Sequence, residues 1–413
     1  MRILQSKAAE NAVTKLAGRG AQLEKVEPRA RQIIGAVRRG GDKTLVRYAT
    51  LWDGLQKGQS MRVPAEEMAE AWQAIPRETQ NALRRAAAGI RRFCQWQMPG
   101  EWRKRVTGGE LGQIVRPLES VGCYVPGGRY PLPSTLLMTV IPAQVAGVPR
   151  IVVVSPRPQP TTLAAATLLG VREVYRCGGA QAVAALAYGT KTIARVDKIV
   201  GPGNSFVTAA KKLVSSDCAI DMLAGPTEAV FYSDKGDPKF LAADMVAQAE
   251  HDPDAVVVLI TTKPALAKRV QAAMTIASQA NVIARQALRR NGHLLIAASR
   301  EQAVAWINRI APEHLTVDED DLAEVRSAGS IFIGDYSPQS AGDYAAGPNH
   351  VLPTAGAARF RGGLSVHDFL KTITVQRFNA AGLASISPVI TTLAEAEGLR
   401  GHAESVRVRC AHA

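Results

Sequence analysis

The dipeptide Glu313-His314 is the first candidate for chemistry, because it places a carboxylate beside an imidazole. It follows a proline and precedes a segment with the composition of a strand, so a loop could present both side chains to a cleft. A carboxylate can activate water, and an imidazole titrates near neutral pH. The pair could therefore move two kinds of proton, although a chance dipeptide would look the same.

Gln248 and His251 lie three residues apart near the end of an expected helix, so they project from one face. Their amide oxygen and neutral imidazole could occupy two corners of a metal site. With Asp343 and His402 they form a set of nitrogen and oxygen ligands without a thiolate, which suits zinc or a similar divalent ion. The four are far apart in sequence, and a helical histidine is more often only hydrogen-bonded. Spacing alone therefore leaves both interpretations open.

Three glycine-rich turns, each between an extended segment and a helix, are candidates for a nucleotide site. They lie at residues 126–128, 178–181 and 201–204. Such turns let backbone amides approach phosphates, and the helix dipole favours the negative charge. The third turn lacks a full G-x-G-x-x-G pattern, because Phe206 occupies the last glycine position. The turns indicate either a nucleotide site of atypical form or ordinary tight turns.

The elements that must position these residues follow an α/β pattern. Periodicity and capping residues predict helices over 28–39, 42–52, 64–75, 76–98, 161–169, 238–251, 264–279 and 301–310, with others after Ser134, after 178 and after 204. Apolar runs predict strands over 150–155, 174–177, 198–200, 229–232, 255–260, 293–297 and 330–333. Residues 1 to 20 are expected to be a polar arm and 335–363 a loop-rich stretch. The tail is expected to form two helices, the first capped by Ser387.

Composition restricts the class of protein. The 413 residues are 46% hydrophobic, which suits two or three globular domains. Five scattered cysteines without CxxC spacing argue against a disulfide framework. The charged N-terminal segment lacks a signal-peptide pattern, so a cytoplasmic enzyme without a membrane partner is expected. The net charge of +14 could indicate nucleic-acid binding, but no binding motif accompanies the basic residues, and solvated helix faces are their usual explanation, so no nucleic-acid partner is expected.

Eight stretches of this sequence resemble the histidinol dehydrogenase family, in the family's order and over nearly the whole chain. They are VGCYVPGG (121–128), GGAQA (178–182), VGPGN (200–204), DMLAGPTE (221–228), AQAEHDPDA (247–255), APEHL (311–315), GDYAAGPNHVLPT (342–354) and GLSVHDFLK (363–371). The resemblance implies a zinc-dependent enzyme that oxidises L-histidinol to L-histidine through the aldehyde, using two NAD. It also implies a homodimer.

The resemblance assigns roles to residues that match the family's motifs. Glu313 would activate water and His314 would take the alcohol proton. The zinc ligands would be Gln248, His251 and Asp343, with His402 of the partner subunit. NAD would lie near Tyr124, Gln181 and Asn204. Besides the ligands and His314, the substrate would contact Ser134, Thr227, His350 and, from the partner, Glu397.

The family fold implies two Rossmann-like domains, the second inserted in the first. The expected division is an arm over 1–20, a first domain over 21–123 and 227–364, an inserted NAD-binding domain over 124–226, and a dimer-exchanging tail over 365–413. Thr227 stands where the family usually has serine, Asp252 where glycine is common and Pro348 where threonine is usual.

Two alternatives remain open from the sequence. One is a related dehydrogenase acting on another small alcohol, such as a sulfonated diol, which a carboxylate at Glu397 would disfavour. The other is a basic nucleic-acid-binding or scaffold protein that has kept the fold without the activity.

Overall fold

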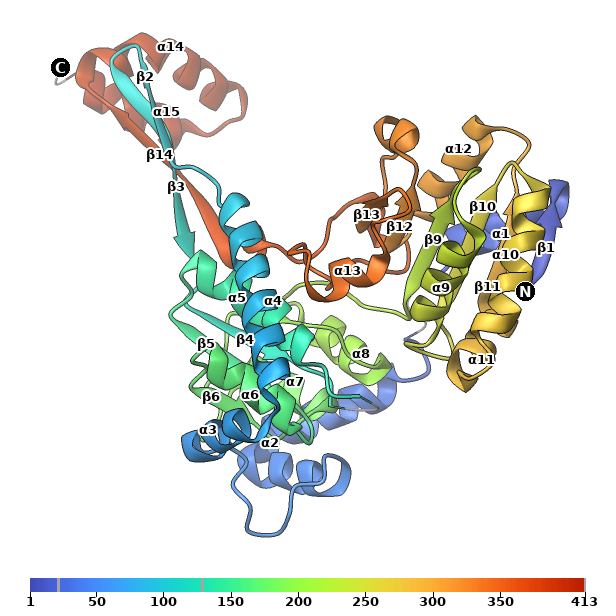
Figure 1. Cartoon of the computed structure of the whole chain (residues 1–413). Helices are drawn as coiled ribbons and strands as arrows, with labels where there is room; N and C mark the ends of the chain where they lie inside the picture. The colour runs from blue at the N-terminus through green and yellow to red at the C-terminus, as the bar shows by residue number, and fades with distance from the viewer. Residues whose placement is uncertain (21–22, 128–129, 412–413) are drawn as a thin grey trace.

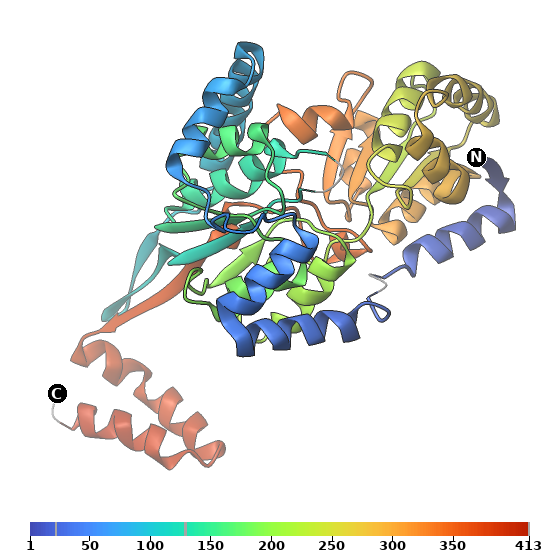
Figure 2. The same cartoon turned by 90° about the horizontal axis from the view of Figure 1, so that it is seen from below.

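The computed structural model describes residues 1–20, 23–127 and 130–411 and has two lobes with a gap between them. A tail carrying the C-terminus projects away from both lobes, as two perpendicular views show (Figures 1 and 2). Each lobe is built on a parallel sheet with helices on both faces, so the predicted α/β class is confirmed. Within the described ranges, no helix is long and apolar enough to cross a membrane.

The first lobe contains a six-stranded parallel sheet in the order β1-β11-β10-β9-β12-β13. The strands are β1 (Arg2–Gln5), β9 (Glu228–Tyr232), β10 (Val256–Thr261), β11 (Gly292–Ile296), β12 (His314–Val317) and β13 (Ser330–Ile333). Helices α9 (Pro238–Ala249), α10 (Pro264–Ala277) and α11 (Val282–Asn291) cover one face, and α1 (Ser6–Ala17) and α12 (Arg300–Ile310) the other. A six-residue 3₁₀ helix, Glu319–Glu324, links β12 to β13.

The second lobe contains a five-stranded parallel sheet in the order β6-β5-β4-β7-β8. Its strands are β4 (Ser120–Tyr124), β5 (Arg150–Val154), β6 (Glu173–Tyr175), β7 (Lys198–Val200) and β8 (Ala219–Ile220). One face packs on α3 (Ala65–Ala74), α4 (Arg77–Trp96), α5 (Pro133–Ala146) and α6 (Pro160–Leu168). The other packs on α2 (Glu27–Trp52), α7 (Gly179–Tyr188) and α8 (Ser205–Val214). All five strands lie between β1 and β9 in sequence, so this sheet is inserted in the first.

The division of the chain differs from the expected one in two places. Residues 1 to 20 were expected to be an arm, but β1 pairs in parallel with β11, and α1 buries Val13 and Leu16 against the same sheet. Residues 21–123 were expected to belong with 227–364, but α2, α3, α4 and β4 share their cores with the five-stranded sheet. The physical cause is packing: these amphipathic helices find their apolar partners in the inserted lobe.

The tail stands on a three-stranded antiparallel sheet, β14 (Leu370–Phe378), β3 (Gly109–Pro117) and β2 (Trp102–Val106). It ends in helices α14 (Ala380–Ala396) and α15 (Arg400–Cys410). Asn379 caps α14 through a hydrogen bond from the Gly382 amide, so the expected cap at Ser387 is wrong, and Pro388 lies inside the helix. The basic residues Arg103, Lys104 and Arg105 lie on exposed β2.

Between β13 and β14 the chain is largely irregular, as expected. It contains the short helix α13 (Gln339–Tyr344) and two 3₁₀ turns, Ala357–Arg359 and Val366–Phe369. This stretch returns to the second lobe, since Val351, Leu364 and Phe369 are buried in the core beneath α5. It therefore crosses from one lobe to the other, and α13 lies on that path.

Candidate active site between the lobes

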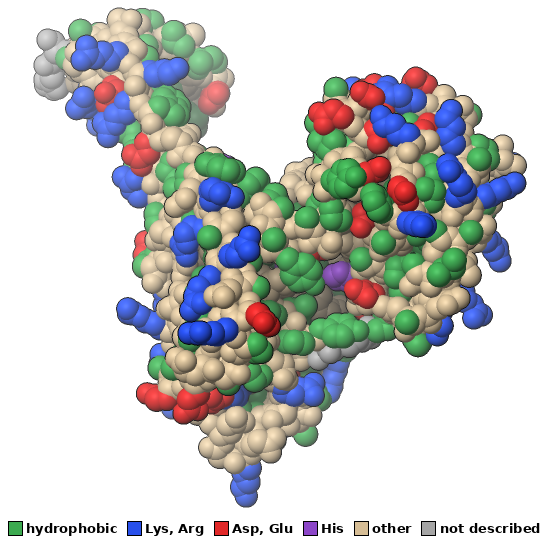
Figure 3. Space-filling view, viewed as in Figure 1, with side chains coloured by type: hydrophobic (Ala, Val, Ile, Leu, Met, Phe, Trp, Pro, Cys, Tyr) green, Lys and Arg blue, Asp and Glu red, His purple; other side chains and the backbone are tan. Residues whose placement is uncertain are grey.

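Strand ends from both parallel sheets face the gap between the lobes. His314 is the first residue of β12 and Glu228 the first of β9, so the amino ends of the six-stranded sheet carry candidate residues. Tyr124 ends β4 and Gly201 follows β7, so the second lobe contributes carboxyl ends. β4 and β7 are the strands at which the order of the five-stranded sheet reverses, which is the usual ligand-binding position in such folds. The space-filling view shows a hollow here with a histidine at its surface (Figure 3).

Glu313 and His314 are both buried at the rim of the first lobe. Helix α12 ends at Ala311, which has a left-handed backbone (φ 51°), and the chain then turns through Pro312 into β12. Glu313 Oε2 accepts a hydrogen bond from the Glu228 amide (3.0 Å) and lies 3.8 Å from His314 Nδ1. The structure thus brings together the predicted acid–base pair.

The surroundings raise the pKa values of both members of this pair. Burial raises the pKa of Glu313 to about 7, with His314 opposing the shift and Glu228 and Asp343 adding to it. Burial alone would lower the pKa of His314, but the carboxylates of Glu313 and Asp343 outweigh it and raise the value. With its pKa raised to about 7, Glu313 can exchange a proton near neutral pH, as a general acid or base requires.

Asp343 joins elements from three parts of the chain. Its Oδ1 lies 3.5 Å from His314 Nε2, and its Oδ2 accepts a hydrogen bond from Gln248 Nε2 (3.3 Å). Its backbone oxygen is 2.8 Å from His350 Nδ1. Burial opposes ionisation of Asp343, but His314 and the other histidines lower its pKa. The carboxylate is therefore held ionised, ready to accept a cation or a proton donor.

The predicted zinc ligands of one chain gather around Asp343. Gln248 is 1% exposed on α9, and its Oε1 has no hydrogen-bond partner among the described residues. A buried carbonyl oxygen without a partner is costly, so this atom suits a cation. His251 follows the end of α9 and lies close enough to Asp343 and His350 to affect their pKa values. This donor set fits zinc, although no three His, Cys, Asp or Glu side chains converge within the described part of one chain.

Phe332, which the sequence did not single out, stacks on His314 with ring centroids 6.0 Å apart and an interplanar angle of 19°. Gly342 in α13 makes room for that ring, since a Cβ there would lie 2.8 Å from two Phe332 carbons. The contact fixes the plane of the imidazole.

We expect Gly342→Ala to displace Phe332 and with it the imidazole of His314. Overpacking of this kind costs about 1–3 kcal/mol, despite alanine's better helix propensity. Thermal unfolding and turnover would both show a loss. Gly362→Ala is the matched control, because a Cβ at Gly362 meets nothing within 4 Å. Equal behaviour of the two variants would contradict this account of Phe332.

Tyr124 and Gln181 position the second glycine-rich turn. The Tyr124 hydroxyl accepts a hydrogen bond from the Gly179 amide (3.0 Å), at the start of α7. Gln181 Nε2 and the Gly178 amide both donate to Asp53 Oδ2 (2.9 Å each). Asp53 is buried at the end of α2, and sequence reasoning missed it because no motif surrounds it. Tyr124 therefore holds this turn directly, through the Gly179 amide, and Gln181 holds it through Asp53.

The third turn is held by a buried ion pair between Lys211 and Asp221. Asp221 Oδ2 accepts a hydrogen bond from the Gly201 amide (2.7 Å), and Lys211 Nζ donates to the Gly201 carbonyl (3.0 Å). Asn204 caps α8, since its Oδ1 accepts from the Phe206 and Val207 amides. The first turn contains Gly128, which lies outside the described residues.

The remaining predicted residues are placed as follows. Ser134 lies in the first turn of α5 and is not its cap, because the helix begins one residue earlier, at Pro133. The Oγ1 atom of the neighbouring residue Thr135 lies 3.4 Å from His350 Nε2. Thr227 directly precedes β9, and its carbonyl accepts a hydrogen bond from Val256 (2.8 Å). Glu397 and His402 are exposed in the tail, which projects away from both lobes in the two ribbon views (Figures 1 and 2).

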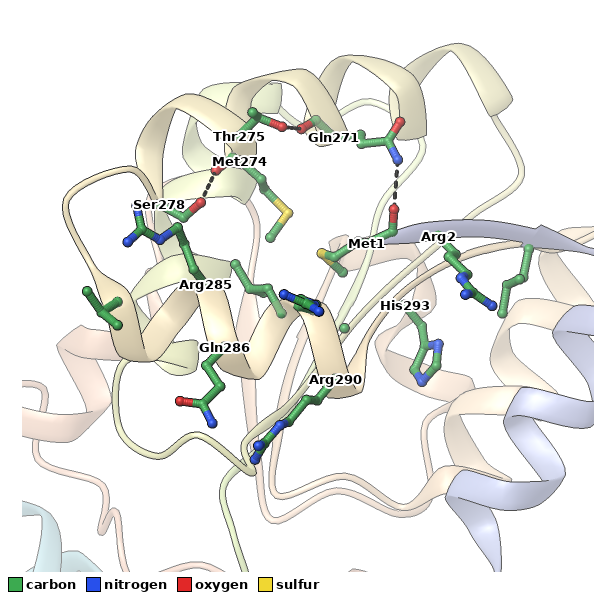
Figure 4. A pocket seen from close by; sticks show the side chains of 15 residues that line it. Met1, Arg2, Gln271, Met274, Thr275, Ser278, Arg285, Gln286, Arg290 and His293 are labelled. Atoms are coloured by element: carbon green, nitrogen blue, oxygen red, sulfur yellow. Dashed lines mark hydrogen bonds between the residues drawn. The ribbon is translucent and has the colours of Figure 1, made fainter.

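A large cavity of about 1260 Å³ lies elsewhere, at the outer edge of the six-stranded sheet. It is bordered by β1, α10 and α11 (Figure 4). Its arginines do not converge: Arg285 and Arg290 point in different directions in the close-up, and Arg290 pairs with Asp254. It shares no residue with the hollow between the lobes.

Comparisons with known proteins agree on one family. The sequence profile of the histidinol dehydrogenases matches residues 17–410. The histidinol dehydrogenase of Methanothermobacter thermautotrophicus is 48% identical over 91% of this chain and 92% of its own length. That of Thermus thermophilus is 45% identical over 97% and 99%. A crystal structure of histidinol dehydrogenase from Elizabethkingia anophelis, 35% identical, covers 99% of this chain and 98% of its own, with a TM-score of 0.94.

Proposed function

This chain belongs to the histidinol dehydrogenase family, and we propose that its reaction takes place in the hollow between the two lobes. It is an NAD-dependent oxidoreductase of histidine biosynthesis that oxidises L-histidinol to L-histidine. The family is also zinc-dependent. The observation that supports the location is the buried network of Glu313, His314, Asp343 and Gln248.

In this proposal His314 takes the proton of the substrate alcohol as the first hydride leaves. Glu313 then removes a proton from the water that adds to the aldehyde, and the second hydride leaves the resulting hydrate. His314 and Glu313 then return these protons to solvent between steps, which a Glu313 pKa of about 7 allows near neutral pH. Zinc, when bound, supplies a Lewis acid that orients the substrate, and NAD supplies the hydride acceptor.

We propose that Gln248, His251 and Asp343 hold the zinc from one chain and that His402 of the partner subunit completes the set. The buried Oε1 of Gln248, which has no hydrogen-bond partner among the described residues, supports its assignment as a ligand. Ser134, Thr227, His350 and the partner subunit's Glu397 remain predicted substrate contacts. Tyr124, Gln181 and Asn204 remain predicted NAD contacts, with the first two acting through the turn they support.

The projecting tail supports a homodimer. Helices α14 and α15 pack on one another and touch neither lobe's core, yet they expose Val389 (61%), Leu393 (59%) and Val408 (43%). Exposed apolar side chains grouped in this way are typical of an interface. A cytoplasmic location and the lack of nucleic-acid or membrane partners stay predictions.

The proposed function is tested by following NADH formation from L-histidinol before and after metal removal. We expect two NADH per histidinol, loss of both after chelation, and their return with zinc, because the substrate is oriented through the metal. Gln248→Ala should weaken zinc retention about 10-fold or more, which metal analysis after dialysis measures independently of activity. Unchanged zinc content in Gln248→Ala would contradict the ligand assignment.

A further inference from the structure

Three connections between the lobes meet at one buried carboxylate, that of Glu228. Arg19 lies on the first connection, from α1 to α2, and its Nε donates to Glu228 Oε1 (2.5 Å). Glu228 itself ends the second connection, which runs from β8 to β9. Ala355 lies on the third, from β13 to β14, and its amide donates to the same oxygen (2.9 Å). Residues from three distant parts of the chain are therefore tied to one side chain.

Glu228 also contacts the predicted catalytic base. Its backbone amide donates to Glu313 Oε2 (3.0 Å). Because β9 and β12 are neighbours in the sheet, with His314 paired to Ala229, a shift of Glu228 would carry Glu313 with it. The position of Glu228 thus determines where the Glu313 carboxylate points.

Arg19 is what holds the Glu228 carboxylate in place. The Glu228 side chain is 4% exposed and that of Arg19 is 16% exposed. Glu228 Oε2 and Arg19 Nη2 are buried and make no further hydrogen bond within the described ranges. Each charge is therefore compensated chiefly by the other, and removal of one leaves the other buried without a partner.

We propose that Glu228, held by Arg19, is a positioning residue that aims the Glu313 carboxylate at the water used in the second oxidation. This rests on the proposed role of Glu313. The charge of Glu228 also raises the pKa of His314, but the hydrogen bond of its amide goes to Glu313, so the larger effect is expected on the second oxidation. Misplacement of a catalytic group by about 1 Å can cost about 100-fold in rate, so even a small release of Glu313 has a measurable effect.

The test separates the two oxidations in zinc-loaded holoenzyme. For Glu228→Gln we expect the rate of the second NADH to fall about 10-fold or more and that of the first to fall much less, with KM for histidinol within about 2-fold. Arg19→Gln should show the same split, and Arg19→Lys should recover part of the loss. The double variant, Arg19→Gln with Glu228→Gln, removes both buried charges, so it should fold normally and keep the defect. A double variant with a normal second step would overturn the proposal.

The pH profile of the second step gives a readout that loosened packing would not move. His314, Glu228 and Asp343 are the charged groups facing Glu313. Loss of the Glu228 charge should shift the acid limb to lower pH, because Glu313 ionises more easily. Loss of the Arg19 charge alone should shift this acid limb to higher pH. Shifts in the same direction, or none, would contradict positioning by the ion pair.

Arg359→Gln is the matched control. Arg359 Nη2 donates to the Ala17 carbonyl (2.9 Å), so it joins the third connection to the first without touching Glu228. We expect both oxidations to keep their wild-type ratio in this variant. Glu313→Gln distinguishes a failure of the proposed function from a failure of the positioning proposal. If Glu313→Gln retains the second oxidation, the proposed function is wrong. If Glu313→Gln loses that step while Glu228→Gln and Arg19→Gln keep it, only the positioning proposal fails.

Discussion

Glu313→Gln is expected to stop the reaction after the first oxidation. The amide keeps the volume of the side chain and can still accept the hydrogen bond from Glu228, but it cannot take a proton from water. Loss of a general base typically costs about 100- to 10,000-fold, so we expect one NADH per histidinol at a near-normal rate and a second that is slower by that factor. Stopped-flow absorbance measures both phases.

The same residue sets the expected pH dependence. Glu313 acts as a base only when ionised, and burial raises its pKa to about 7. The rate of the second oxidation should therefore be low in acid and rise through about pH 7. A bound cation attracts the carboxylate form, so the midpoint measured with zinc should lie at or below that value. A second step that is equally fast at pH 5 and pH 8 would exclude Glu313 as the titrating base.

Mixing two inactive variants is expected to restore activity. If His251 and His402 serve one site from different subunits, His251→Ala and His402→Ala each destroy every site in their own homodimers. In a mixed dimer, one of the two sites receives both native histidines. Random re-association gives half mixed dimers, so about a quarter of the wild-type activity should return.

The control for this experiment is a mixture of His251→Ala with Asp343→Asn. Both residues belong to the same chain's part of the site, so no intact site can form in a mixed dimer. Activity in this control, or none in the mixture with His402→Ala, would rule out a site shared between subunits.

Much of the fold could be predicted because local signals and tertiary packing agree. The buried strand β10 is a continuous apolar run, and α9 begins where Asp237 caps it and Pro238 follows. Such segments carry their structure in their own composition. The acid–base pair was predicted for the same reason, because Pro312 and the strand that follows place Glu313 at the amino end of β12.

The wrong predictions of the fold concern segments whose structure depends on residues far away in the sequence. β1 has only two apolar residues and exists because β11 offers it an open edge. The assignment of α2 to a lobe depends on which core accepts its apolar face, which its own sequence does not state. In α14, Ser387-Pro388 looks like a helix start, yet the helix runs through Pro388 because Asn379 caps it earlier.

Site residues were missed where a motif did not mark them. Asp53 and Arg19 act through buried hydrogen bonds between chain segments far apart in sequence. Phe332 is an apolar residue in a strand, and only its stacking on His314 gives it a role. Asp221 and Glu228 do lie in a resembling stretch, but their function depends on backbone amides that sequence cannot locate.

The pairing of β1 with β11 has a consequence for how the chain folds. Every strand and helix of the inserted lobe lies between these two partners, so β1 must stay unpaired until most of the chain has been made. Contacts so distant in sequence form slowly, whereas the inserted sheet is assembled from near neighbours. During synthesis the inserted lobe can therefore assemble most of its core before β1 pairs with β11, and Val351, Leu364 and Phe369 complete that core afterwards.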